Sequence, residues 1–162
     1  MPDTNSPAFE SIFDPEMLRP LTDALQPSLV DLLALQLIVK QLHWNVTGPG
    51  FRPIHLHLDE IYEAVTEAVD SIAERLSAMA ISPSGQASDI ASGSDLAPVA
   101  PGFLLDTEVL KFAHSRLGTV CRNVRSLMET IEGVDAVTAD LFHAILLGLE
   151  KHLWMLRVQL TG

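Results

Sequence analysis

Four long segments of the chain place apolar residues at the spacing of a helix, and only one of the connections between them is long. The segments run from about Ser28 to Asn45, Arg52 to Ala80, Thr107 to Glu132 and Asp135 to Leu160. Apolar residues three and four positions apart make one face of a helix, which has to be buried against other helices. A chain of 162 residues suits a single domain. The pattern therefore predicts an all-α fold built as a four-helix bundle.

Proline and glycine mark where the first helices begin and end. Residues 48–50, Gly-Pro-Gly, interrupt the first segment, and Pro53 suits the first turn of a new helix because it has no N–H to lose. Upstream, Pro20 and Pro27 fall inside an apolar helical pattern. A proline within a helix removes a hydrogen bond and clashes with the preceding turn, so we expect a break or kink near Gln26.

The long connection covers Ser82 to Asp106 and is rich in Ser, Gly, Pro and Ala. Connections longer than about 12 to 15 residues usually contain a short helix or have a function, and Ala87 to Ala91 could form one turn of helix. One class of four-helix bundle has a single long crossover of this kind. We therefore place a crossover between the second and third helices.

The second segment carries two pairs of possible metal ligands at four-residue spacing. His55 and Asp59 form one pair, and Asp70 and Glu74 form the other, so the side chains of each pair lie next to each other on one face of the helix. The two pairs are separated by about 16 Å of helix, so one ion cannot contact both. Imidazole and carboxylate suit Fe(II), Mn(II) or Zn(II).

The two pairs are arranged symmetrically about residues 64 and 65. If a second copy of the helix lies antiparallel across a two-fold axis there, the first pair of one chain meets the second pair of the other, and each contact occurs twice. This predicts two intersubunit metal sites, with His43 on the preceding helix as an extra ligand. Solvated surface residues are the alternative. The apolar residues that flank the pairs favour a site, because charged groups beside a buried stripe need partners or a cation.

Three motifs around these pairs resemble the signature of the Dps family, the twelve-subunit mini-ferritins of bacteria. They are His43-Trp44-Asn45-Val46-x-Gly48-x-x-Phe51, His55-x-x-x-Asp59 and Asp70-x-x-Ala73-Glu74-Arg75. The resemblance covers the chain from roughly Ser28 to Leu160. It implies a ferritin-like four-helix bundle with a long crossover between helices 2 and 3, and assembly into a hollow dodecamer.

The resemblance also implies a ferroxidase centre between two-fold related subunits. Its ligands would be His43, His55 and Asp59 from one subunit, with Asp70 and Glu74 from the neighbour. Two Fe(II) ions would bind at each site, with Zn or Mn as substitutes. Hydrogen peroxide or O2 would oxidise the iron to a ferric mineral stored in the shell, which protects the cell from oxidative damage. No Glu-x-x-His motif occurs in the sequence, so the metal chemistry cannot use the ligand motif found inside larger ferritin bundles.

Further residues near the motifs have two interpretations each. Trp44 could be a radical sink beside the site or a large packing residue, and Lys40 is interpreted as solvated rather than as a residue that buffers the charge of the site. His57 lies about 200° around the helix from His55, so we treat it as an ordinary exposed or interface histidine.

Three acids near the start of the last helix are candidates for a pore through which iron enters. They are Asp140, which aligns with a pore acid of the family, and Asp135 and Glu132, which match less cleanly. Solvated acids at a helix end are an equal alternative.

Charge and composition limit the partners. The chain has 10 Lys and Arg against 21 Asp and Glu, a formal charge of −11, which repels nucleic acid and attracts cations. Residues 1–13, expected to be a flexible tail, contain no lysine. DNA binding of the kind seen in lysine-tailed family members is therefore not expected, and a DNA-coating nucleoid protein is the alternative function. A shell that binds Zn or a partner without oxidation is another.

The sequence also predicts where the bundle domain begins and in which compartment the protein is found. Residues 14–162 are expected to form the bundle domain, because Asp14 can cap a helix and Pro15 fits its first position. No signal peptide is recognised and no apolar run reaches the length of a membrane span. Together with the single Cys121, interpreted as a buried small hydrophobe, this favours a cytoplasmic protein. Hydrophobic residues make up 48% of the chain, and the excess over a soluble monomer is interpreted as the subunit interface of a homo-oligomer.

Overall fold

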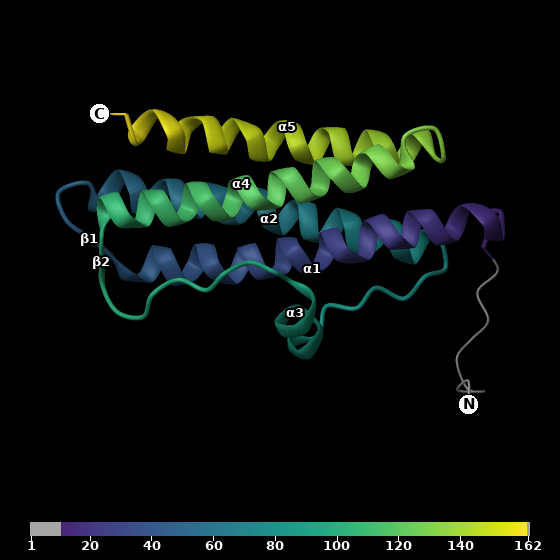
Figure 1. The fold of residues 1–162 in the computed structure, drawn as a ribbon, viewed down its shortest axis with the longest axis horizontal. Helices are drawn as coiled ribbons and strands as arrows, with labels where there is room; N and C mark the ends of the chain where they lie inside the picture. The colour runs from purple at the N-terminus through teal and green to yellow at the C-terminus, as the bar shows by residue number, and fades with distance from the viewer. Residues whose placement is uncertain (1–10, 162) are drawn as a thin grey trace.

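The computed structural model describes residues 11–161, and within them the chain forms the expected four-helix bundle (Figure 1). Its elements are α1 (Pro15–Asn45), β1 (Val46–Thr47), α2 (Phe51–Ala78), α3 (Ala87–Gly93), β2 (Leu104–Leu105), α4 (Asp106–Ile131) and α5 (Ala136–Gln159). The predicted bounds of the long helices after α1 are confirmed to within two residues. Most of the tail predicted at residues 1–13 lies outside the described part of the chain.

One hydrophobic core joins all four long helices. α1 packs against α2 and α4, and α5 packs against α4 and α2. Leucine, isoleucine and valine fill most of the fully buried positions on α1, α2 and α4, and Phe142 is fully buried on α5. Cys121 is also buried, as expected, and burial raises the pKa of its thiol to about 12. The thiol is therefore protonated and packs as an apolar side chain.

The break expected near Gln26 is absent, because α1 runs through Pro20 and Pro27 as one helix of 31 residues. Leu21 and Leu25, which lie between the two prolines, have no exposed surface. Burying a leucine contributes about 1.5–3 kcal/mol, so the packing offsets the backbone hydrogen bonds that the two prolines remove. The expectation of a break is wrong because it weighted local proline chemistry above the tertiary packing of the helix, and the kink stays a prediction.

The long crossover runs along the outside of the bundle beside α1 (Figure 1). It contains α3, which confirms the expected turn of helix near Ala87. The Gln26 amide fastens one end, since it donates to the Ser84 carbonyl and accepts from the Ser84 N–H. The buried Asp31 fastens the middle by accepting from Ser94 and Asn123. These contacts give a long connection a defined path.

The end of the crossover fixes the turn between α1 and α2. β1 and β2 pair in parallel, with Val46 opposite Leu104. Asp106 then accepts a hydrogen bond from the Gly50 N–H at 2.6 Å. Gly48 adopts a φ of 109°, which favours glycine. The last turn of α1 and the first turns of α2 are thereby held side by side.

Among the described residues, only α1 is long and apolar enough by composition to cross a membrane. Half of its apolar window is buried inside the bundle, which is what a core helix requires. Packing of the helices against one another therefore accounts for the buried half of this window.

Candidate metal centre

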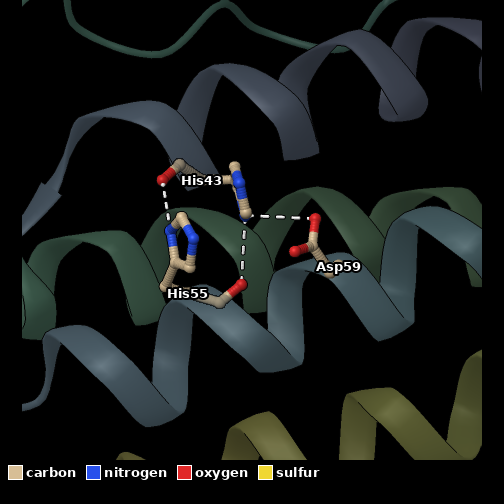
Figure 2. Close-up of side chains that lie close together, drawn as sticks. All are labelled: His43, His55 and Asp59. Atoms are coloured by element: carbon tan, nitrogen blue, oxygen red, sulfur yellow. Dashed lines mark hydrogen bonds and ion pairs between the residues drawn. The ribbon is translucent and has the colours of Figure 1, made fainter.

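The turn between α1 and α2 brings together three of the five predicted ligands. His43 lies in the last turns of α1, and His55 and Asp59 lie in the first turns of α2 (Figure 2). One ligand atom from each residue lies within 4.8 Å of the other two. His43 is buried, whereas His55 and Asp59 are partly exposed. The group therefore opens to solvent on one side.

The backbone orients both imidazole rings. His43 Nδ1 lies 3.1 Å from the carbonyl oxygen of His55, and His55 Nδ1 lies 3.0 Å from the carbonyl oxygen of His43. Because a carbonyl oxygen only accepts, each Nδ1 carries the proton and donates. The rings stack with centroids 3.7 Å apart. Each histidine thus keeps the lone pair of Nε2 for an ion, with its orientation fixed by the kind of outer hydrogen bond that metal-binding histidines use.

Asp59 completes the group and is ionised. Its Oδ1 lies 2.8 Å from Lys40 Nζ and 3.2 Å from His43 Nδ1. The hydrogen bond from Lys40 lowers the pKa of Asp59, partial burial opposes this shift, and the charge of Lys40 lowers the pKa further. The carboxylate is therefore a charged ligand at neutral pH.

The other predicted pair lies elsewhere on the same helix. Asp70 and Glu74 are exposed on α2, and eleven residues separate Asp59 from Asp70 along this continuous helix. That is about 16 Å of rise, so a single chain cannot bring Asp70 or Glu74 to the group. Their part in the site stays a prediction that needs a second copy of the chain.

Comparisons with known proteins identify the family. A ferritin-like domain matches residues 22–162. DNA protection during starvation protein 2 of Deinococcus radiodurans is 35% identical over 91% of this chain, which spans 61% of that protein's length. The fine tangled pili major subunit of Haemophilus ducreyi is 30% identical over 88% of this chain and 75% of its own. The structure of Dps92 from Deinococcus radiodurans superposes with a TM-score of 0.85 at 35% identity, covering 88% of this chain and 87% of that one.

The chain belongs to the Dps family of ferritin-like proteins. The resemblance drawn from the motifs is therefore confirmed at the level of family and fold. The pilus subunit among the relatives shows that proteins of this similarity carry different names, so the fold alone does not settle the function. The function therefore depends on the geometry of the site.

Lys40 is the site residue that the sequence interpretation placed wrongly. It is not simply solvated, because its ammonium bonds to Asp59 and lies 4.9 Å from the ring centroid of Tyr62. The spacing of Lys40 to His43, three residues along α1, was a usable signal, since residues at that spacing share a helix face. Trp44 points away from the core and is 65% exposed.

The three pore candidates have different environments in the Dps-family fold. Asp135 caps α5 and accepts from Arg75 at 2.6 Å and from the Thr138 N–H. Burial would raise the pKa of Asp135, but the hydrogen bonds from Thr138 and Arg75 outweigh it and the pKa is lowered. Asp140 and Glu132 are exposed. Asp135 therefore has a structural task, and the pore role stays a prediction for all three.

His57 was expected to be an ordinary exposed or interface histidine, and the exposed alternative is wrong because α5 covers it. Only 9% of its surface is exposed, and its Nε2 lies 3.2 Å from Nδ1 of His152. Gln159 Nε2 lies 3.2 Å from the other ring nitrogen. Burial lowers the pKa of both histidines, although the charge of Glu60 opposes the shift. His152 was not recognised from the sequence, because its pairing with His57 depends on the register between α2 and α5.

Proposed function

We propose that this Dps-family chain is a ferroxidase and an iron-storing mini-ferritin. The observation that carries the proposal is the convergence of His43, His55 and Asp59 within 4.8 Å. Two imidazoles with free Nε2 atoms and one carboxylate form a ligand set suited to Fe(II). Exposure on one side leaves room for further ligands and for the oxidant.

A second copy of the chain would complete the site. Asp70 and Glu74 are exposed carboxylates on the same helix, at the positions that a two-fold axis near residues 64 and 65 brings to the first pair. Exposed apolar side chains on the surrounding surface support such a contact, because burying them would stabilise it: Leu37, Trp44, Phe51 and Leu56. We propose a homo-oligomer with this interface, a dodecamer as in the family.

The proposed reaction balances without releasing a radical. Two Fe(II) ions each lose one electron, and one hydrogen peroxide takes up both electrons and two protons to form two waters. His43 and His55 hold iron through Nε2, and Asp59 exchanges its Lys40 partner for the ion. The freed ammonium has the same sign of charge as the iron, so it is repelled from the occupied site. The Fe(III) product moves to the shell interior as mineral.

The negative charge of the protein limits which partners it attracts. We propose that the protein is cytoplasmic. With a formal charge of −11, its shell attracts Fe(II) and does not coat DNA. A gel-shift with linear DNA at low salt, with a lysine-tailed member of the family as positive control, should show free DNA. Tight binding would instead support the nucleoid alternative.

An anaerobic Fe(II) titration of the metal-free assembly, followed by one pulse of peroxide, tests the proposal. We expect saturation near two irons per shared site and a fast rise in ferric absorbance. Asp59→Asn combined with Glu74→Gln should preserve assembly and slow the oxidation by at least about 100-fold, because two ligands are lost.

The matched control is Asp23→Asn with Glu129→Gln, which removes the same charges at exposed positions outside the group. Its oxidation rate should equal that of the wild type. Unchanged rapid oxidation in the Asp59 and Glu74 variant would refute the site assignment.

A further inference from the structure

A second group of possible ligands joins α2 to α5. One nitrogen from His57, one from His152 and one carboxylate oxygen of Glu60 lie within 4.8 Å of one another. His57 and Glu60 are three residues apart on α2, so both occupy one side of that helix. His55 lies on another side, about 200° away. The group is therefore separate from the His43, His55 and Asp59 cluster.

The spacing of the two imidazoles fits a single tetrahedral ion. His57 Nε2 and His152 Nδ1 are 3.2 Å apart. Two nitrogens bound to one Zn²⁺ at about 2.0–2.1 Å in a tetrahedron are about 3.3 Å apart. The rings are tilted by 37° with centroids 5.4 Å apart, so they are not stacked on each other. An ion would replace the short contact once both rings turn so that their nitrogens face a common point beside the line that joins them.

A hydrogen bond between two neutral imidazoles accounts for the same distance in the metal-free protein. Gln159 donates to His57 Nδ1, and His57 Nε2–H then donates to His152 Nδ1. Apolar side chains would fill this part of the α2–α5 interface without the cost of burying polar rings. The two imidazoles beside an acid are the feature that packing alone does not require.

Glu60 supplies what a cation needs in addition to the two nitrogens. Its side chain is exposed, whereas both histidines are 9% exposed. The acid therefore adds a negative charge at the mouth of the group and leaves a path from solvent. Three protein ligands of this kind, with water in the fourth position, form a recognised zinc coordination set.

We propose that His57, Glu60 and His152 bind one divalent transition-metal ion of the Zn²⁺ type within each chain. Imidazole and carboxylate are also suitable ligands for Co²⁺ and Fe²⁺. Binding through Nε2 requires His57 to change tautomer: the proton moves from Nε2 to Nδ1, and the Gln159 amide turns so that its oxygen accepts it. The site does not depend on a second chain, and it stands whether or not the intersubunit centre oxidises iron.

Metal titrations of the full chain test the proposal in the Asp59→Asn, Glu74→Gln background, which disables the intersubunit site. Zn²⁺ is followed by calorimetry, and Co²⁺ by the visible absorption of the four-coordinate ion. We expect one class of sites at one ion per chain. Adding His152→Gln should weaken its affinity at least about 10-fold.

A matched control keeps the test specific to this group. His143→Gln removes an exposed histidine that also lies near a carboxylate, 3.8 Å from Asp140, and should leave the one-per-chain class intact. Glu60→Gln changes an exposed side chain, so it tests the ligand set without disturbing the core. It should also weaken binding.

Two results would overturn the proposal. One is a parent protein that binds no Zn²⁺ or Co²⁺ at one ion per chain. The other is equal affinity and stoichiometry in the parent and in both the His152→Gln and Glu60→Gln variants. Circular dichroism and oligomer size, measured on each variant, establish that the bundle is folded in the samples compared.

Discussion

Two histidine groups share α2 and are built in opposite ways. In the first, each ring donates its Nδ1–H to a backbone carbonyl and keeps Nε2 for an outside partner. In the second, the buried rings of His57 and His152 bond to each other. The first faces an ionised acid and open solvent, and the second lies under α5. Residue type alone therefore does not define a metal site, because the partner of each ring nitrogen decides what the ring can bind.

The largest expected effect comes from comparing two variants, each of which removes one of two neighbouring acids. Asp59 and Glu60 are neighbours in sequence but belong to different groups. Asp59→Asn should slow peroxide-dependent iron oxidation at least about 100-fold and leave the one-per-chain Zn²⁺ site intact. Glu60→Gln should weaken the one-per-chain Zn²⁺ site and leave peroxide-dependent iron oxidation at the wild-type rate. Stopped-flow absorbance and calorimetry on the same preparations measure both. Equal loss in both assays for either variant would mean that the two groups are not separate.

An intermediate effect, confined to Zn²⁺ binding and to the pH dependence of stability, is expected when the second group is made apolar. His57→Leu with His152→Phe removes both partners of one hydrogen bond, which is close to neutral for stability when the shapes fit. Iron oxidation should proceed at the wild-type rate. If oxidation falls together with the second site, the groups act as one unit.

The pH dependence of stability should also differ between the wild type and this variant. Burial lowers the pKa of His57 and His152 in the folded, metal-free protein, so below about pH 6.5 the unfolded chain binds more protons than the folded one. Wild-type stability should therefore fall relative to the variant as the pH drops from 6.5 toward the folded pKa values. The lowered pKa of Asp59 acts in a different window, below about 3.9, where its stabilising contribution is lost. Urea unfolding in the presence of a chelator measures the free energy of unfolding in both pH ranges. A difference that is constant between pH 8 and 5 would contradict the burial argument.

The smallest expected effect belongs to Lys40. Lys40→Met removes the ammonium that bonds to Asp59 but leaves every ligand in place. The pKa of Asp59 should rise, and the oxidation rate at neutral pH should change by only a few-fold, because the carboxylate stays ionised. Lys111→Met, on the exposed surface of α4, is the control. A loss as large as that of Asp59→Asn would make Lys40 part of the reaction rather than a neighbour of it.

The sequence was most informative where the signal is local. Helical spacing, Gly133 and the Asp135 cap located the long helices, and the His43 to Asp59 motif located the cluster that the fold brings together. Expectations failed where packing between helices decides. α1 continues through Pro27 because the apolar residues near this proline are buried. The sequence of one helix does not indicate which ring on another helix Lys40 or His57 will contact.

The central claim is that the ferroxidase centre is shared between two chains, and mixing two inactive variants tests it most directly. Asp59→Asn and Glu74→Gln proteins are purified separately, dissociated, mixed in equal amounts and reassembled. When one chain of each kind meets across the two-fold axis, one of their two sites has all five ligands. Random pairing should restore about one quarter of the wild-type fast oxidation. No recovery in a mixture that is shown to contain both chains in one assembly would contradict the shared site.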